Sequence, residues 1–138
     1  MKAPLSLLSL FCAWLLVACV DDYQDANPAR QLDGPAIFSV NAAAKSVVAG
    51  GTVSLTANVV DAPGGIASVA ASAVDEDGDE AGSFTVTNSR SGETKGLVEL
   101  LYQAPDGYVG EITITVTVTD AQSPPKKSAP VTTTIEVI

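Results

Sequence analysis

Carboxylates dominate residues 75–80, which read Asp-Glu-Asp-Gly-Asp-Glu. Asp75, Asp77 and Asp79 stand two positions apart, so their side chains project to the same side of an extended loop. Ca²⁺ prefers oxygen ligands and takes about six to eight of them. We therefore interpret Asp75, Asp77 and Asp79 as candidate calcium ligands, and calcium is the only cofactor that the sequence suggests.

The same segment departs from the EF-hand calcium loop. Gly78 comes too early, and no acidic residue occupies the twelfth position of the loop. A calcium site would therefore need further oxygens from Asp106 or Glu111. The alternative is a solvated hairpin loop without a metal, because aspartate is common in turns for the hydrogen bonds it makes to the backbone.

Catalytic machinery of the common kinds is missing from the sequence, which has no histidine. Ser-His-Asp and Cys-His arrangements both use that side chain as a base. A pair of carboxylates could serve as acid and base in a glycosidase, but exposed carboxylates lack the burial that raises a pKa toward neutrality. Gly50 and Gly51 precede a predicted strand rather than a helix, which argues against a nucleotide site. We expect no enzymatic activity.

Acidic residues outnumber basic ones, sixteen to seven, and the formal net charge is −9. This balance repels the phosphates of nucleic acids and anionic lipid headgroups. We expect no nucleic-acid partner, and a protein or a carbohydrate as the ligand if there is one.

Both cysteines lie near the N-terminus, in a segment with the features of an export signal. Lys2 supplies positive charge, residues 5–17 are mostly apolar, and small Ala18 precedes Cys19. The apolar stretch is shorter than the roughly 20 residues of a transmembrane helix. Three interpretations are open: a lipoprotein signal cut before Cys19, an ordinary secretory signal cut nearby, and an uncleaved anchor helix. In the first, Cys12 is removed and no free thiol remains.

Residues 16–19, Leu-Val-Ala-Cys, resemble the bacterial lipobox, in which a small residue precedes the cysteine that is acylated. The resemblance implies that Cys19 becomes the lipidated N-terminus, and two acyl chains hold a protein stably on a membrane. Val20, in place of aspartate, implies transport to the outer membrane of the bacterial cell envelope. The three aspartates within residues 21–25 resemble the surface-export tags of some Gram-negative lipoproteins, with a solvated acidic tether as the alternative.

The chain divides into three predicted segments. Residues 1–18 are the signal-peptide helix, residues 19–34 are an acidic flexible tether, and residues 35–138 are one folded domain. The tether has too few apolar residues to offset the entropy of ordering it. The domain has about 100 residues, which is enough for one hydrophobic core.

Alternation of apolar residues with threonine predicts β-strands in the domain. It is clearest at residues 112–119 and 131–137, and it continues at residues 52–60. Weaker patterns predict strands at residues 36–41, 67–74, 83–88 and 95–103. About seven short strands with turn residues between them predict an all-β, antiparallel two-sheet sandwich. The predicted core is Phe38, Val40, Val53, Leu55, Ala57, Val59, Phe84, Val86, Leu100, Tyr102, Ile112, Ile114, Val116, Ile135 and Val137.

Reversal of successive strands also predicts which loops meet. The turns at residues 62–64 and 123–125 should share one pole with the start of the domain. The acidic loop and the turn at residues 105–107 should share the other pole. Because the tether joins at the first pole, we expect the acidic pole and the C-terminus to point away from the membrane.

Four stretches together resemble consecutive landmarks of PKD-like and cadherin-like immunoglobulin-fold modules of bacterial envelope proteins. They are residues 49–57 (AGGTVSLTA), 75–79 (DEDGD), 102–105 (YQAP) and 110–120 (GEITITVTVTD). The resemblance implies an immunoglobulin-like sandwich that serves as a non-catalytic binding or spacer module, although one fold hosts many functions.

Two hypotheses for the function follow. The first is a lipid-anchored binding or adhesion module of the cell envelope, which uses distal loops or a threonine-rich sheet face. The second is a structural accessory subunit of a larger envelope complex, without a ligand of its own. Exposed aromatic residues would favour sugar binding. Beyond the predicted signal peptide, only Tyr23 and Tyr108 lie outside the predicted core, so a carbohydrate ligand is not favoured.

Overall fold

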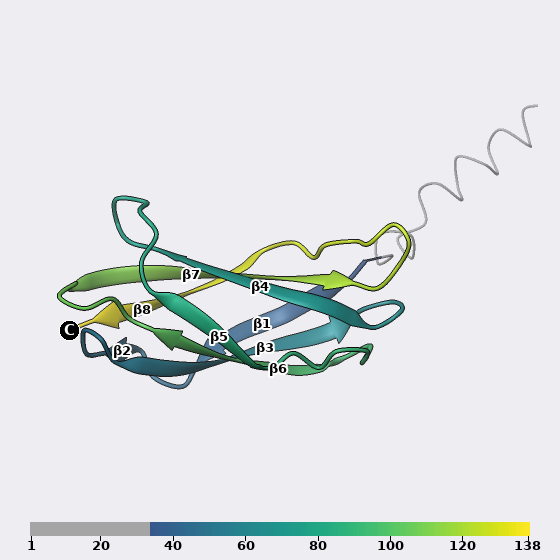
Figure 1. Cartoon of the computed structure of the whole chain (residues 1–138), viewed down its shortest axis with the longest axis horizontal. Coiled ribbons are helices and arrows are strands. Elements are labelled where there is room, and N and C mark those ends of the chain that lie inside the picture. The colour runs from purple at the N-terminus through teal and green to yellow at the C-terminus, as the bar shows by residue number, and fades with distance from the viewer. Residues whose placement is uncertain (1–33) are drawn as a thin grey trace, which may run out of the picture. The chain divides into compact units, whose positions relative to one another are not determined.

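The computed structural model describes residues 34–138 (Figure 1). The predicted signal peptide, the lipidation site Cys19 and nearly all of the predicted tether lie outside the described residues. The strands are β1 (Ala36–Ala42), β2 (Ser46–Val47), β3 (Thr52–Asp61), β4 (Ile66–Val74), β5 (Ser83–Asn88), β6 (Gly96–Gln103), β7 (Gly110–Asp120) and β8 (Val131–Val137). Within residues 34–138 no helix has the length and apolarity needed to cross a membrane.

The strands form two sheets that pack face to face. The strand orders are β1-β3-β6-β5 and β2-β8-β7-β4. All strand pairs in the described domain are antiparallel except β2 with β8, which is parallel. The predicted all-β, two-sheet sandwich is therefore confirmed. The sequence predicts one strand fewer, because β2 has only two residues and no alternation to detect.

β7 illustrates how the sequence builds the sandwich. Its isoleucine and valine side chains from Ile112 to Val118 are wholly buried, whereas the threonines between them lie half-buried on the outer face. β-branched side chains suit such a pleated, half-buried surface. β3 and β8 show the same alternation, so the core lies between the two sheets.

Most of the predicted core residues are buried. They are Val40, Val53, Leu55, Ala57, Val59, Leu100, Tyr102, Ile112, Ile114, Val116, Ile135 and Val137. Other buried apolar residues were not predicted from the sequence, namely Val47, Ala62, Ile66, Ala73, Ala81, Val98, Ala104 and Val118. Several of these are alanines at strand ends, where no period marks the inward side.

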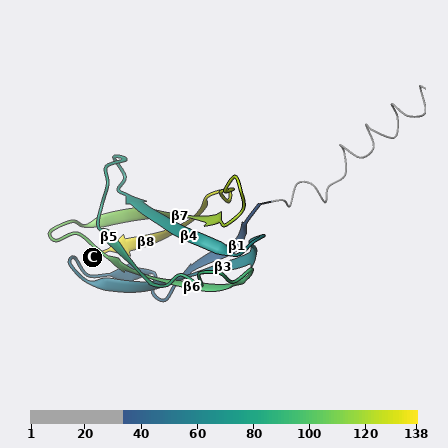
Figure 2. The ribbon, with the colours of Figure 1, turned by 45° about the vertical axis from the view of Figure 1, so that its right-hand side comes forward.

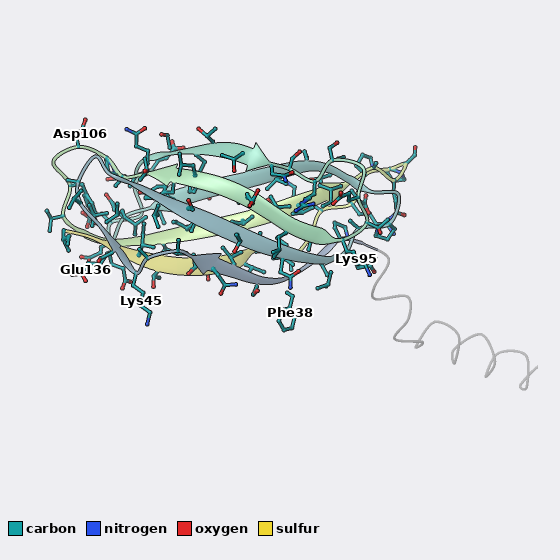
Figure 3. All side chains as sticks on the ribbon, turned by 90° about the horizontal axis from the view of Figure 1, so that it is seen from below. Phe38, Lys45, Lys95, Asp106 and Glu136 are labelled. Atoms are coloured by element: carbon teal, nitrogen blue, oxygen red, sulfur yellow. The ribbon has the colours of Figure 1, made fainter. Side chains whose placement is uncertain are left out.

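The prediction of Phe38 as a core residue is wrong. Its side chain is 75% exposed and points away from the β1 ribbon (Figure 3). Ile37 pairs with Val59 and Ser39 pairs with Asn58, so Phe38 is left unpaired between them. Such a β-bulge reverses the alternation of inward and outward side chains. Ile37 therefore packs against the core in place of Phe38.

The prediction of Val86 as a core residue is also wrong, because its side chain is 41% exposed. β5 is an edge strand, and its pairing with β6 becomes irregular between Val86 and Asn88. A residue near this irregular end is not enclosed by neighbouring strands. Phe84, two positions earlier, is half-buried and packs on Tyr102, with the ring centres 5.0 Å apart.

The domain has two poles, which Figures 1 and 2 show at opposite ends. At the proximal pole, where β1 begins, Gly34 lies against the Lys126 side chain, and the amide of Ala121 donates to the carbonyl of Gly65. At the distal pole, the amide of Gly50 donates to the carbonyl of Pro105. The C-terminus lies at this pole, beside β2 (Figure 1). The predicted assignment of the loops to the two poles is confirmed.

Candidate functional site

The acidic loop, residues 75–80, connects β4 to β5 at the distal pole. One carboxylate oxygen of Asp75 accepts hydrogen bonds from the amides of Asp77, at 3.0 Å, and Asp79, at 2.9 Å. Gly78 adopts a φ of 86°, which favours glycine over other residues. The carboxylate of Asp75 therefore closes a tight turn, whereas Asp77 and Asp79 are exposed.

The structure does not bring the three candidate calcium ligands together as a site. In residues 34–138, no group of three or more acidic side chains is placed to hold a metal ion. The hydrogen bonds to Asp75 agree with the alternative of a solvated hairpin loop. Calcium binding by Asp75, Asp77 and Asp79 stays a prediction.

Tyr108 lies in the turn that precedes β7 and interacts with the acidic loop. Its hydroxyl donates to the carbonyl of Glu111 at 3.1 Å, and its ring packs against the edge of the core. Burial raises the pKa of Tyr108, and the negative charges of the acidic loop raise it further, while a hydrogen bond with the backbone of Glu76 lowers it. The acidic loop therefore lies close to the Tyr108 phenol.

An apolar row, Val48, Val109 and Ile138, crosses the distal pole. The amide of Ile138 donates to Val47 at 2.9 Å, and Gly110 pairs with Val137, so the row joins three neighbouring chain segments. Its side chains are 61%, 71% and 58% exposed, respectively. The row could not be recognised in the sequence, because its three residues lie in separate segments and only the pairing of β8 with β2 and β7 brings them side by side.

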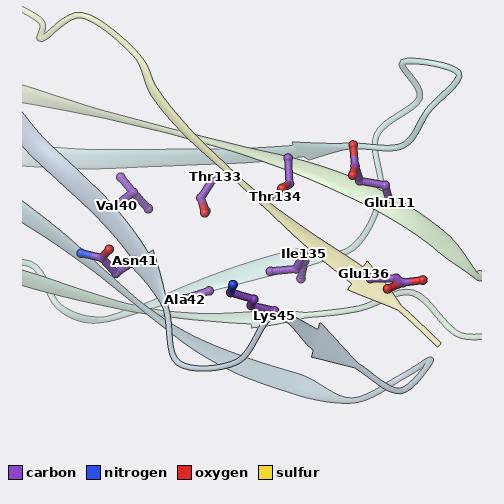
Figure 4. A pocket seen from close by; sticks show the side chains of 9 residues that line it. All are labelled: Val40, Asn41, Ala42, Lys45, Glu111, Thr133, Thr134, Ile135 and Glu136. Atoms are coloured by element: carbon purple, nitrogen blue, oxygen red, sulfur yellow. The ribbon is translucent and has the colours of Figure 1, made fainter.

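A pocket of about 510 Å³ opens beside β1 and β8 (Figure 4). It is lined by Val40, Asn41, Ala42, Lys45, Glu111, Thr133, Thr134, Ile135 and Glu136. Lys45 lies on the connection between β1 and β2, with β8 across the pocket from it. Within the described residues, no carboxylate lies within ion-pair distance of the Lys45 ammonium. Hydroxyls, carboxylates and one ammonium suit a polar ligand better than an apolar one.

Charge is distributed unevenly between the poles. The acidic loop, Asp106 and Glu136 lie at the distal pole, and Figure 3 shows Lys95 at the opposite end. Arg90 forms an ion pair with Glu93 at 3.6 Å and donates to the carbonyl of Leu97, next to Lys95. The distal pole is therefore the more negative of the two.

Asp120 organises the proximal loop between β7 and β8. Its carboxylate accepts hydrogen bonds from the amide of Lys126, at 2.8 Å, and from the side-chain amide of Gln122, at 2.6 Å. The residue is fully buried. Burial raises the pKa of Asp120, but these hydrogen bonds and the Lys126 charge outweigh it and lower the pKa below the ordinary 3.8. The ionised carboxylate is thus part of the folded structure.

We expect the stability of the domain to fall as the pH drops below about 4, through the lowered pKa of Asp120. In that window the unfolded chain binds more protons than the folded chain, so acid favours unfolding. Asp120→Asn should lower the melting temperature at neutral pH and flatten this acid-dependent loss. Thermal unfolding by circular dichroism across the window measures both effects. Asp106→Asn, at an exposed position, is the control, and equal pH slopes for Asp120→Asn and the wild type would contradict the prediction.

Comparison of the chain with protein-family models, with curated proteins and with solved structures finds no match.

Proposed function

We propose that this chain is a lipid-anchored binding or adhesion module of the bacterial cell envelope, built on an immunoglobulin-like sandwich and without catalytic activity. The strand order supports the immunoglobulin-like assignment. In that fold, strands A, B, E and D form one sheet in the order A-B-E-D, and C, F and G form the other. The order β1-β3-β6-β5 corresponds to the first sheet, and β4, β7 and β8 correspond to the second.

The separation of the two poles is the observation that carries the proposed role. β1 begins at the proximal pole, so a tether that ends at Gly34 joins the domain there. The distal pole presents the acidic loop, the apolar row and the nearby pocket. A domain held at one end and exposing varied side chains at the other is suited to contact a partner away from its anchor. The motif at residues 16–19 supports a lipid as that anchor.

Fatty-acid labelling in a bacterial host tests the anchor, and the chain supplies its own control in Cys12. The wild-type chain and Cys12→Ser should incorporate labelled fatty acid, whereas Cys19→Ser should incorporate none. Mass spectrometry of the wild-type protein should find residues 1–18 removed and acyl chains on Cys19. An unmodified Cys19 thiol, or an intact Met1, in the cellular protein would overturn the anchored location.

Pull-down of the wild-type chain from detergent-solubilised membranes tests the role. An envelope protein recovered in a one-to-one molar ratio with the chain would favour an accessory subunit. The absence of such a protein would favour an independent binding module.

A further inference from the structure

β4 is the longest edge strand of the described domain. It lies at the end of its sheet, beside β7 only, and its nine residues include no charged residue and no proline. Proteins usually protect exposed edges with charges, prolines, bulges or very short strands. β2 has only two residues, and β1 and β5 are shorter than β4 and have irregular pairing. β4 also has one register shift, between Ile66 and Ser68, but its pairing with β7 is regular from Ser68 to Val74. A long, uncharged edge is a surface on which another strand can pair.

On the side away from β7, the middle of β4 has backbone N–H and C=O groups without a hydrogen-bond partner in residues 34–138, whereas both ends of the strand are bonded. At one end, the carbonyl of Ala73 accepts from the amide of Ala81 at 2.9 Å. At the other end, Ile66 donates to Glu93 at 2.9 Å and accepts from Gly92 at 3.0 Å. Alternate residues of a strand direct their N–H and C=O groups to the same side.

It follows that Val69 and Ala71, which alternate with Ala73, direct their backbone groups away from β7. Within the described residues, these groups have no hydrogen-bond partner at the open edge. Their side chains point toward the core, whereas Ala70 between them is exposed on the outer face.

The sequence of β4 is almost symmetric about Ala70. The residues at equal distances on either side of Ala70 are Val69 and Ala71, Ser68 and Ser72, Ala67 and Ala73, and Ile66 and Val74. In an antiparallel pair centred on Ala70, residues of the same kind therefore lie opposite each other. Val69 of one strand and Ala71 of the other would exchange hydrogen bonds on both sides of the axis, which pairs the N–H and C=O groups of both residues.

We propose that two copies of this domain dimerise by antiparallel pairing of β4 with β4, about a two-fold axis at Ala70. The inference goes beyond the proposed function and does not depend on the lipid at Cys19. The pairing would join the two β2-β8-β7-β4 sheets into one continuous sheet.

Charge complementarity also favours a second copy as the occupant of the edge. The acidic loop follows the end of β4 directly, whereas the segment from Arg90 to Lys95 is bonded to its start through Ile66. Antiparallel pairing brings the acidic loop of each copy beside the segment from Arg90 to Lys95 of the other, which has a net charge of +1 because Glu93 offsets one of its two basic residues. Acidic loops are thereby kept away from each other, and opposite charges steer the copies into this register. A strand donated by an unrelated protein would not meet this symmetric arrangement.

A cysteine at the axis tests the geometry in the full chain, purified in detergent. Opposed residues of a non-hydrogen-bonded antiparallel pair have Cα atoms about 4.5 Å apart, within the range of a disulfide. Ala70→Cys should therefore form a disulfide-linked dimer under mild oxidation. Ser54→Cys, exposed on the other sheet, is the matched control, and the wild-type chain controls for Cys12 and Cys19. Equal cross-linking of Ala70→Cys and Ser54→Cys, or none, overturns the proposal.

Sedimentation velocity of the full chain tests the energetics. Ala70→Lys places two like charges opposite each other across the interface and should weaken the dimer roughly tenfold or more. Ala70→Thr keeps a strand-forming residue there and should leave the dissociation constant within about threefold. Circular dichroism checks that both variants fold. A monomeric wild-type chain, or a dimer that Ala70→Lys does not weaken, overturns the proposal, whereas fatty-acid labelling of Cys19 is unaffected by either result.

Discussion

Replacing Tyr102 with alanine is expected to lower the free energy of unfolding by about 3–5 kcal/mol. The Tyr102 ring is completely buried between the sheets and packs on Phe84 with the ring centres 5.0 Å apart. Its hydroxyl donates to the carbonyl of Ala81 at 2.9 Å, and burial raises its pKa. Alanine would leave a cavity in the core and an unpaired carbonyl beside it. Since small domains are stable by only about 5–15 kcal/mol, this loss is severe.

Chemical denaturation followed by circular dichroism measures the effect, and two controls separate its parts. Tyr102→Phe keeps the ring and removes only the hydroxyl, so its cost should be about 1–2 kcal/mol. Tyr108→Phe removes a hydroxyl that also donates to a backbone carbonyl, but outside the core, so its effect should be smaller than that of Tyr102→Phe. A Tyr102→Ala variant as stable as Tyr102→Phe would show that the ring is not a core residue.

Gly82→Ala should be about as damaging, with an expected loss of about 3–5 kcal/mol. Gly82 has a φ of 89°, a conformation that strains any residue with a Cβ atom. An added methyl group would also meet the Tyr102 ring and hydroxyl, each at 2.6 Å, and the carbonyl of Gln103. The backbone or the Tyr102 ring would have to shift, which disturbs the hydrogen bond from Tyr102 to Ala81.

Gly78→Ala is the matched control for this substitution. Gly78 has nearly the same φ, 86°, but an added methyl group meets nothing within 4 Å. Its cost should therefore be that of backbone strain alone, about 1 kcal/mol. Denaturation of the two variants in parallel separates strain from collision. Equal losses for Gly82→Ala and Gly78→Ala would mean that the close approach to Tyr102 does not contribute.

The fold could be predicted where side chains alternate strictly. β7 and β8 combine isoleucine or valine inside with threonine outside, so their period is visible in the sequence. The bulge at Phe38 could not be predicted, because it depends on how β1 pairs with β3 rather than on the residues of β1. The inward side of β4 is similarly hidden, since its small residues fit either face of a sheet.

The candidate site could be predicted only in part, for a related reason. The acidic loop is contiguous in the chain, and the reversal of strands was enough to assign it to the distal pole with the turn at residues 105–107. The apolar row of Val48, Val109 and Ile138 consists of residues from three separate segments. The pocket beside Lys45 is likewise lined by residues from β1, β7 and β8. Such surfaces arise from strand register, which the sequence specifies only indirectly.

The uneven charge of the two poles makes the domain an electric dipole along its long axis. Four of the five basic residues in the described chain, Arg90, Lys95, Lys126 and Lys127, follow strands that end at the proximal pole, opposite the acidic loop. Near a negatively charged surface, the electric field would exert a torque that turns the proximal pole toward the surface before any atoms touch. Because salt screens the field within about 8 Å under physiological conditions, the alignment would act only on domains already held close to that surface.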